Sequence, residues 1–467
     1  MSQFELPEGW FNATIQDVAE VKGGKRLPKG KALTDQKTAH AYIRVTDMNN
    51  GSIDQSDIRY IDEETYKEIS NYFISKDDLY ISIAGTIGLV GDIPNELDGA
   101  NLTENAAKIC SLMGVEKHYL KYVLNSLIAK EQFEDKVTSS GQPKLALFRI
   151  RDCKFPLPPL AEQQVIADKL DTLLAQVESI KARLERIPEI LKQFRQSVLA
   201  AAVSGKLTEE WRVAKGITIE TWKYEAAKNV CEKVQSGSTP RENPFDQNGT
   251  VPFLKVYNIV DQKIDFDYKP QFITSETHSK GSSARSVAFP NDVLMNIVGP
   301  PLGKVAILTN QFPEWNLNQA ITLFRVKKEL LDHKYLYYVL CEGALVREVM
   351  PETKGSVGQV NISLSQCREA ILPVPSIEEQ REVVLCIDKL FNNADVIDTY
   401  VHSALNRVNN LTQSILAKAF RGELTAGWRE ANTDLISGEN SAEALLKRIK
   451  AERESAKPTT KRGRAET

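Results

Sequence analysis

One segment of this chain occurs twice, and both copies alternate apolar residues at spacings of four and three. The first copy covers residues 159–212 and the second covers 376–429, aligned without a gap. Both end in almost the same letters, "SGKLTEEWR" at 204–212 and "RGELTAGWR" at 421–429. An apolar residue about every 3.5 positions is typical of the seam of a left-handed coiled coil. The sequence therefore predicts two long helices that pair with each other.

The seam keeps its register throughout both copies. Its residues are Ile166, Leu170, Leu173, Val177, Ile180, Leu184, Ile187, Leu191, Phe194 and Val198 in the first copy, and Val383, Ile387, Leu390, Ala394, Ile397, Val401, Ala404, Val408, Leu411 and Ile415 in the second. An amphipathic helix lying on a globular core is the alternative, but a register held in both copies favours pairing. Pro188 predicts a kink, or a new helical segment near Ile187. Gly205 and Gly422 are placed to end the helices.

The regions that precede the two helices also match, more loosely. "AYIRVTDMNNGSID" (41–54) is similar to "PFLKVYNIVDQKID" (252–265), and "HYLKYVLNSL" (118–127) is similar to "KYLYYVLCEG" (334–343). Short strands, glycine turns and one short helix are typical of an α+β module. We therefore predict an α+β fold with two similar modules separated by two long helices. If the second module returns the chain, the helices pair antiparallel and form a dumbbell with an approximate two-fold axis.

This organisation divides the chain into five segments. They are a first module at 1–158, a first helix at 159–212, a second module at 213–375, a second helix at 376–429, and a short helix with a basic flexible tail at 430–467. A chain of 467 residues that is 42% hydrophobic can bury more than one core. Its six cysteines are scattered, which argues against disulfides and zinc. Neither a signal peptide nor a membrane span is evident, so we expect a reduced, cytoplasmic protein.

The order of module, helix, module and helix carries a resemblance to a known family. Together with "PPLAEQQVIADKLDTLLAQV" (158–177) and "NNLTQSILAKAFRGELTAGWR" (409–429), it resembles the DNA-specificity subunit of Type I restriction-modification systems, most closely the IA family. The resemblance covers essentially the whole chain. It implies two target-recognition domains, each reading one half of a bipartite DNA site. It also implies that the antiparallel coiled coil fixes the distance between the half-sites.

The resemblance further implies partners that carry the chemistry. Two modification subunits would dock on the coiled coil and methylate DNA with S-adenosylmethionine. Two restriction subunits, motor nucleases that use ATP and Mg, would join them for defence against foreign DNA. This chain would itself be non-catalytic and hold no cofactor.

The sequence contains no convincing catalytic or metal-binding motif of its own. "IVGPPLG" (297–303) is the nearest approach to a methyltransferase motif, but glycine and leucine replace the polar and aromatic residues, which favours a turn. No phosphate-binding loop and no Ser-His-Asp group is present. Asp17, Glu20 and Lys22 could form a nuclease-like set, although such combinations are common in a chain with 62 acidic residues. We predict no catalytic and no metal-binding residues.

The net charge of −3 means that DNA would have to be bound by local patches. Loops with small residues, amides and cations are the candidates, because small residues let backbone approach phosphates and amides or arginines reach base edges. In the first module the candidates are Lys25, Arg26, Thr86, Asn101, Thr103, Asn105, Gln142 and Lys144. In the second they are Ser238, Thr239, Arg241, Lys304, Asn316, Asn318, Gln319, Lys354, Gln359 and Asn361. The alternative for each loop is a solvated turn between strands.

Polar and aromatic residues at the helix ends are candidates for the interface with the modification subunits. They are Gln163, Gln164, Trp211, Gln380, Arg381 and Trp428. For the two tryptophans, packing against their own module is an equally good interpretation. The basic tail at the end of the chain could contact DNA or a partner, although a solvated end is the simpler interpretation.

Two other functions compete with the recognition subunit. A protein-interaction scaffold with two modules on a rigid spacer would share the pattern but would give no bipartite DNA footprint. A stand-alone enzyme is disfavoured by the missing motifs.

Overall fold

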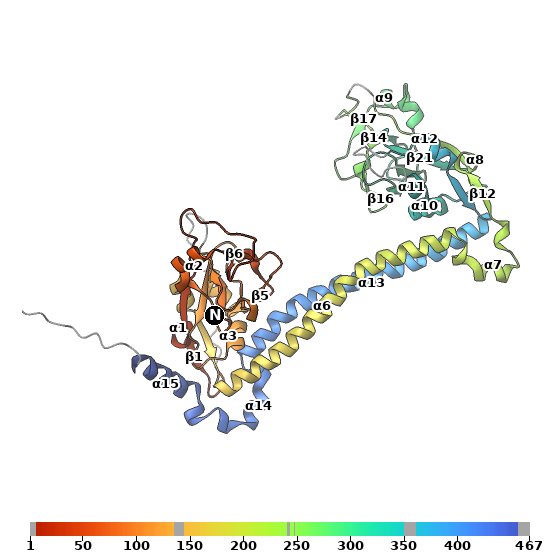
Figure 1. The fold of residues 1–467 in the computed structure, drawn as a ribbon. Helices are drawn as coiled ribbons and strands as arrows, with labels where there is room; N and C mark the ends of the chain where they lie inside the picture. Colours follow the sequence, from red (N-terminus) through yellow and green to blue (C-terminus); the bar gives the residue numbers. More distant parts are fainter. Residues whose placement is uncertain (1–5, 135–143, 241–242, 247, 350–360, 456–467) are drawn as a thin grey trace, which may run out of the picture. The chain divides into compact units, whose positions relative to one another are not determined.

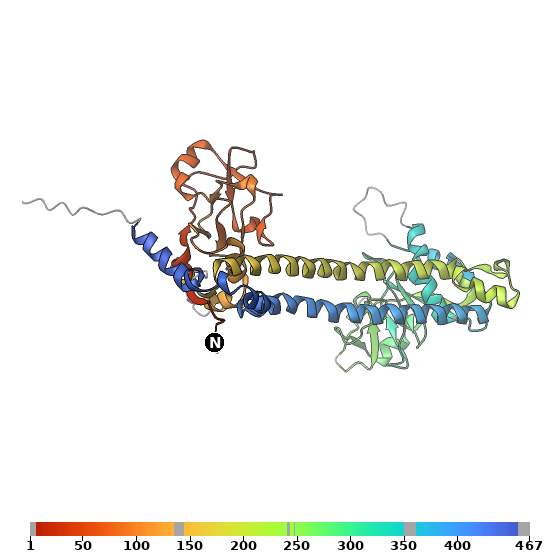
Figure 2. The same ribbon diagram turned by 90° about the horizontal axis from the view of Figure 1, so that it is seen from below.

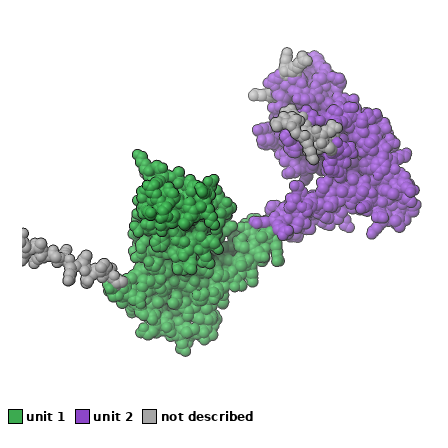
Figure 3. Space-filling view, in the orientation of Figure 1, with its two compact units in different colours: residues 1–184, 404–467 green, residues 185–403 purple. Residues whose placement is uncertain are grey.

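The computed structural model describes residues 6–134, 144–240, 243–246, 248–349 and 361–455. The chain forms two compact units, coloured separately in Figure 3. Unit 1 contains residues 1–184 and 404–467, and unit 2 contains residues 185–403. Each unit thus combines one module with one end of each long helix. Within the described residues, no helix is both long and apolar enough to span a bilayer.

The two long helices are α6 (Leu160–Val203) and α13 (Ile377–Phe420), each 44 residues long. In unit 1, Lys169 Nζ donates to Leu424 O at 2.8 Å, while Glu162, earlier in α6, contacts Arg429. In unit 2, Arg195 pairs with Asp395 at 2.6 Å, and Thr208 contacts Glu379. Rising numbers in one helix meet falling numbers in the other, so the helices are antiparallel in each unit. Figures 1 and 2 show them side by side.

The seam between the helices is buried where a module packs on it and is partly open elsewhere. Ile166 and Leu170 are fully buried in the core of unit 1, together with Leu416 and Phe420. Ile180, in the same predicted seam, is 47% exposed. Further along the seam, Leu191 and Val401 are 6% and 4% exposed although neither belongs to the core of a module, so burial varies from one seam position to the next. Helix α6 continues through Pro188, so no new segment starts there.

The module of unit 1 is built on a four-stranded antiparallel sheet in the order β2-β10-β7-β8 and a three-stranded sheet in the order β6-β3-β9. Its elements are β1 (Phe11–Thr14), α1 (Ile15–Val18), β2 (Glu20–Gly23), β3 (His40–Ile43), β4 (Met48–Asn49), β5 (Ser52–Ile53), β6 (Arg59–Ile61), α2 (Glu63–Ile69), β7 (Leu79–Ser82), β8 (Val90–Asp92), β9 (Asn101–Leu102), β10 (Ala106–Cys110), α3 (Lys117–Asn125), α4 (Leu127–Glu134), α5 (Leu147–Arg151) and β11 (Lys154–Leu157). Two helices of the chain end, α14 (Ala426–Ala431) and α15 (Ala442–Ser455), also belong to this unit.

The module of unit 2 repeats this plan. Its sheets have the orders β13-β21-β18-β19 and β17-β14-β20. The elements are α7 (Glu209–Lys215), β12 (Lys223–Ala226), α8 (Ala227–Val230), β13 (Cys231–Ser236), β14 (Val251–Leu254), β15 (Ile259–Val260), β16 (Lys263–Ile264), β17 (Phe272–Ile273), α9 (Ser275–Ser279), β18 (Val293–Asn296), β19 (Val305–Ile307), β20 (Asn316–Leu317), β21 (Ile321–Val326), α10 (His333–Glu342), α11 (Ala344–Val349), α12 (Leu364–Glu369) and β22 (Ile371–Val374). The predicted α+β class with two similar modules and two long paired helices is confirmed.

A buried carboxylate joins the helix ends in each unit, and the repeated tail supplies its partners. In unit 1, Glu162 accepts from Trp10 Nε1 at 2.8 Å, Thr425 Oγ1 at 2.6 Å and Arg429 Nε at 3.1 Å. We call these four residues the Glu162 clamp. Gly422, in the left-handed conformation, follows the end of α13. Its carbonyl oxygen accepts a hydrogen bond from Arg429 Nη2.

Unit 2 contains the same arrangement. Glu379 accepts from Trp222 Nε1 at 2.9 Å, Thr208 Oγ1 at 2.7 Å and Arg212 Nη1 at 2.5 Å, and these residues form the Glu379 clamp. In both clamps the carboxylate begins one long helix, and the threonine and arginine follow the end of the other. The duplicated ending of the sequence therefore fastens the antiparallel helices to each other.

Candidate nucleic-acid interface

In unit 1, the loops predicted to contact DNA come together at the ends of three strands. Lys25 N donates to Leu102 O at 2.8 Å, which joins the loop after β2 to β9. Ile83 N donates to Asn105 O at 2.8 Å, and Leu145 N donates to Ile83 O at 2.8 Å. Residues 25–26, 84–86, 103–105 and 144 thus form one surface, which we call loop cluster 1.

A glycine makes this close approach possible. A Cβ atom added to Gly24 would lie 2.1 Å from Thr103 O, so a larger residue could not occupy this position without moving the backbone. Gly237 has the same role in unit 2, where the added atom would lie 2.1 Å from Asn318 O. Only glycine lets the two loops of each module meet.

An ion pair lies at the centre of loop cluster 1. Arg26 Nε donates to Glu104 Oε1 at 2.7 Å, and the Arg26 side chain is 80% exposed. Thr103 Oγ1 donates to the other carboxylate oxygen at 3.1 Å. Burial raises the pKa of Glu104, but the hydrogen bonds from Arg26 and Thr103 and the charge of Arg26 outweigh it, so the pKa lies below its ordinary value. The carboxylate is therefore a charged acceptor that holds the arginine.

The equivalent loops of unit 2 meet in the same way. Ser238 N donates to Leu317 O at 2.9 Å, and Ile297 N donates to Ala320 O at 2.8 Å. Ile362 N donates to Ile297 O at 2.9 Å and brings in the loop that contains Asn361. Residues 238–239, 298–301, 318–319 and 361 form loop cluster 2. Here the corresponding pair consists of two uncharged side chains. Thr239 Oγ1 donates to Gln319 Oε1 at 2.5 Å.

The predicted DNA-binding residues fall into four groups. Exposed residues are Lys25, Arg26, Thr86, Asn105, Lys144, Gln319 and Asn361, and partly exposed ones are Ser238, Thr239, Lys304 and Asn318. Buried residues are Asn101, Thr103 and Asn316. Gln142, Arg241, Lys354 and Gln359 lie outside the described residues. Both loop clusters therefore present several of the predicted side chains to solvent.

The expectation that Asn101, Asn316 and Thr103 are exposed to bases is wrong. Asn101 and Asn316 have no exposed surface, and their amides donate to Ile69 O and Ser283 O at 2.9 and 3.0 Å. Each asparagine lies in a strand that joins the three-stranded sheet, so its amide is used inside the fold. Thr103 is 6% exposed, and its hydroxyl donates to Glu104.

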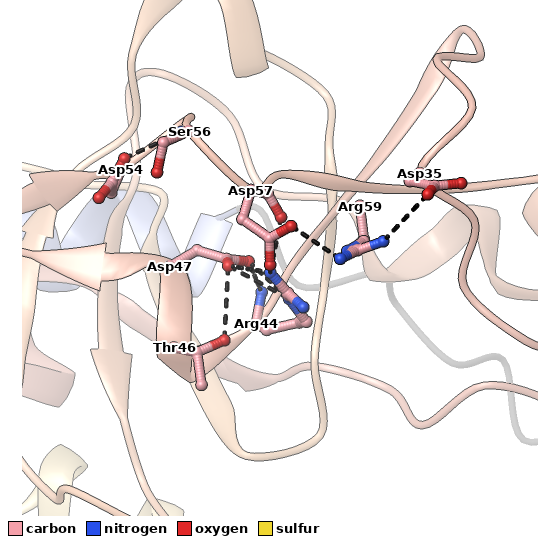
Figure 4. Close-up of polar contacts among 8 residues, drawn as sticks. All are labelled: Asp35, Arg44, Thr46, Asp47, Asp54, Ser56, Asp57 and Arg59. Atoms are coloured by element: carbon pink, nitrogen blue, oxygen red, sulfur yellow. Dashed lines mark hydrogen bonds and ion pairs between the residues drawn. The ribbon is translucent and has the colours of Figure 1, made fainter. Parts of the chain in front are cut away.

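Two arginines near loop cluster 1 are already paired with aspartates. Figure 4 shows Arg44 between Asp47 and Asp57, with Nη2 2.6 Å from Asp47 Oδ1 and 3.1 Å from Asp57 Oδ2. Arg59 contacts Asp57 at 2.7 Å and Asp35 at 3.8 Å. These cations stabilise the loops of the three-stranded sheet. Arg26, by contrast, meets a single carboxylate among the described residues, and its side chain is 80% exposed.

A family model described as the Type I restriction modification DNA specificity domain matches residues 7–189 and 219–400. The chain belongs to this family. It is 35% identical to the Type I restriction enzyme EcoBI specificity subunit of Escherichia coli, over 96% of this chain and 93% of that protein. It is 34% identical to the EcoKI specificity subunit of Escherichia coli (strain K12), over 97% of both. The family predicted from the sequence is thereby confirmed.

Solved structures show the same fold. The crystal structure of the HsdS subunit from Thermoanaerobacter tengcongensis has a TM-score of 0.61 and 19% identity, and it covers 90% of this chain and 99% of that one. A chain from a study of assembly and conformational transition of the type I R-M system has a TM-score of 0.64 at 19% identity, covering 90% and 100%. The chain is a DNA-recognition subunit, and specificity subunits are not the catalytic ones.

Two residues proposed for the partner interface of this specificity subunit are inside the protein. Gln163 and Gln380 have no exposed surface. Gln163 accepts from Glu116 N at 2.8 Å and donates to Pro158 O at 2.9 Å, and Gln380 accepts from Asp332 N at 2.7 Å and donates to Pro375 O at 2.9 Å. The expectation of exposed amides is wrong here, because both side chains bind the start of the long helix to its module.

The other four partner candidates remain accessible. Gln164 and Arg381 are exposed, and Trp211 and Trp428 are partly exposed. The clamps use the residue after each tryptophan, Arg212 or Arg429, with Trp10 and Trp222 from the modules. Sequence reasoning missed these four clamp residues and also Glu104. The repeat itself could have indicated Arg212 and Arg429, because both copies end in Trp-Arg.

The nuclease-like set of the first module has structural roles. Asp17 accepts from Thr14 N at 2.8 Å and Thr14 Oγ1 at 2.6 Å, which caps α1. Glu20 and Lys22 pair with each other at 2.5 Å. "IVGPPLG" forms the turn between β18 and β19, as predicted. Among the described residues, no group of three or more possible ligands could hold a metal ion.

Proposed function

We propose that this specificity subunit reads a bipartite DNA site, with one half-site bound by each module. The observation that carries the proposal is the repetition of the loop cluster. Both modules gather the same loops at the same strand ends, yet their polar side chains differ. Two similar surfaces with different chemistry suit two different DNA words.

In this proposal, residues 1–158 and 213–375 are the two target-recognition domains. Residues 159–212 and 376–429 form the spacer, and 430–467 is a helix with a basic tail. Two half-sites face the same side of the duplex when their centres lie about one helical turn, roughly 34 to 36 Å, apart. An inserted heptad in the spacer should therefore change the spacing that is read and leave the words unchanged.

The partners in this proposal are double-stranded DNA, two modification subunits and two restriction subunits, in the cytoplasm. The modification subunits use S-adenosylmethionine, and the restriction subunits use ATP and Mg. On this chain, Gln164, Trp211, Arg381 and Trp428 are the remaining candidates for the interface with the modification subunits. Two repeated helix ends can offer similar surfaces to two copies of one partner.

The test is a module exchange in the assembled complex. Residues 1–158 are replaced by the corresponding region of a relative, and the methylated positions are mapped in the DNA of cells that contain all subunits. We expect one half-site to change while the other half-site and the spacing persist. A change in both half-sites, or in neither, would contradict the proposal. The matched control replaces residues 213–375 and should alter the opposite half-site.

A further inference from the structure

We propose that Arg26 reads a guanine in the half-site of the first module, and that Glu104 is the residue that positions it. This inference rests on the proposed function. It adds that loop cluster 1 recognises a G·C base pair in the first half-site.

The geometry of the ion pair leaves the recognition edge of the guanidinium open. Only Nε of Arg26 donates to Glu104, at 2.7 Å, and the side chain is 80% exposed. Among the described residues, neither terminal nitrogen has a hydrogen-bond partner, so the Nη1–Nη2 edge can donate to another group. Guanine offers O6 and N7 in the major groove, and two parallel donors of an arginine match them. An arginine held at Nε presents that pair of donors without first having to be ordered.

Glu104 is itself held in place. Its side chain is 25% exposed, and Thr103 Oγ1 donates to its second oxygen at 3.1 Å. Lys144 Nζ donates to its backbone oxygen at 3.3 Å. Thr103 therefore holds the carboxylate and Lys144 holds the backbone of the same residue, so Glu104 is positioned to fix Arg26.

The equivalent pair in unit 2 offers a different reader, the amide of Gln319 at the position of Glu104. Lys25 N and Ser238 N bond the equivalent carbonyls of Leu102 and Leu317, which aligns Arg26 with Thr239. Here Thr239 Oγ1 donates to Gln319 Oε1 at 2.5 Å, and Gln319 is exposed. Among the described residues, Nε2 of Gln319 has no hydrogen-bond partner and can donate. Glutamine pairs with adenine N6 and N7. The equivalent base pair of the second half-site is therefore A·T.

The first test measures methylation by the complex of this chain with its modification subunits. The substrates are duplexes of the mapped site with one base pair changed at a time. We expect one G·C pair of the first half-site to be discriminated by about 5- to 150-fold, the range that one bidentate contact gives. Arg26→Lys should lose this preference, because lysine keeps the charge but cannot offer two parallel donors. If Arg26 only contacts a phosphate, the lysine variant will retain the preference, and the inference fails.

The second test separates positioning from folding. Glu104→Ala removes a negative charge beside DNA, so binding to unrelated DNA should stay equal or become tighter while selectivity for guanine falls. Glu104→Gln, which can still accept from Nε, should restore part of the selectivity. A merely structural role would lower both kinds of binding together, and that result would overturn the assignment. Arg59→Lys, in the same module but held by Asp57 and Asp35, is the matched control.

The third test concerns the amide reader. Thr239→Val keeps the shape of the side chain but removes its hydroxyl, and it should reduce the preference for A·T in the second half-site only. An unchanged preference, or a required G·C pair at that position, would contradict this half of the inference. The module exchange described above tests the proposed function separately. The exchange may change one half-site without removing a required G·C pair. That result would support the proposed function and contradict the assignment of Arg26.

Discussion

The two units share the residues that fasten the long helices and differ in the polar pairs of their modules. The Glu162 and Glu379 clamps use the same four residue types. In the loop clusters, Arg26 and Glu104 in unit 1 correspond to Thr239 and Gln319 in unit 2. The clamps join the same two helices in both units, so the same residue types are needed in each. The polar pairs of the modules have no such shared partner and can therefore differ.

The same contrast recurs away from the loop clusters. After β3, Asp47 accepts from the backbone of Arg44, and after β14, Asn258 accepts from the backbone of Lys255. On β8, Asp92 lies 2.6 Å from Lys121 of α3, while Ile307 holds the equivalent strand position in unit 2. Unit 1 thus depends on ion pairs at positions where unit 2 uses neutral groups. The comparison predicts different responses of the two units to charge removal and to acid.

The largest effect should come from the clamps, where the units are alike. Glu379→Ala leaves Arg212 buried and without its carboxylate, which should cost about 3 to 5 kcal/mol of unfolding free energy. Glu162→Ala should cost somewhat less, because Arg429 is 14% exposed and Arg212 only 7%. Chemical denaturation gives the loss, and hydrogen exchange assigns it to a unit. A loss below about 1 kcal/mol for both variants would show that the clamps do not fasten the helices.

The next effect should appear in unit 1 alone, because only unit 1 is covered by α15. Ala442, Leu445, Leu446 and Ile449 of this helix lie in the core of unit 1. Leu446→Ala should destabilise that unit by about 2 to 5 kcal/mol. The measurement is hydrogen exchange in peptides of α1 and α3, compared with peptides of unit 2, which should not change. Leu435→Ala, at a position 45% exposed, is the control and should have little effect.

The equivalent face of unit 2 has no such cover within the described residues. Gln163 Nε2 donates to Gly114 O in unit 1, and Gln380 Nε2 donates to Leu330 O in unit 2, so the two positions correspond. Leu445 and Ile449 lie against Gly114. Leu330 is 43% exposed beside a hollow of about 420 Å³ that Val374 and Ile377 also line. The symmetry of the repeat therefore ends at α15.

A third difference should appear in acid. Burial raises the pKa of Asp92, but the hydrogen bonds and charges of Lys121 and Lys117 outweigh it, and the pKa lies below its ordinary value. A lowered pKa means that this stabilisation is present above the unfolded pKa of about 4 and is lost as the pH falls through the folded value. Asp92→Asn should cost about 1 to 2 kcal/mol at neutral pH and flatten the acid dependence of unit 1. Denaturation of the unaltered chain and of Asp92→Asn across acidic pH measures both quantities. Asp77→Asn, exposed in the same module, should change neither quantity, and an unchanged slope in Asp92→Asn would contradict the account.

The long helices could be predicted because their signal is local and repeated. Ile166 and Leu170 fall in the predicted seam and are buried. The clamps could not be predicted in full, because Trp10 and Glu162 meet only once strands, module and helix have closed on each other. Asn101 and Asn316 show the opposite problem. Their polar neighbours, "NLTEN" and "NLNQ", indicate an exposed loop, but each amide donates to a backbone carbonyl inside the fold. Pattern reasoning found the loops and not the direction of their side chains.

The smallest predicted effect concerns the open part of the seam. Ile180 and Leu170 occupy the same predicted stripe, but Ile180 is 47% exposed and Leu170 is fully buried. Ile180→Ala in the isolated chain should therefore cost about 1 kcal/mol or less, compared with about 2 to 5 for Leu170→Ala. Denaturation of the chain alone measures both. An equal cost would mean that Ile180 is buried in solution, as Leu191 and Val401 of the same seam are in the structure. If the cost of Ile180→Ala rises once modification subunits are added, a partner covers this exposed part of the seam.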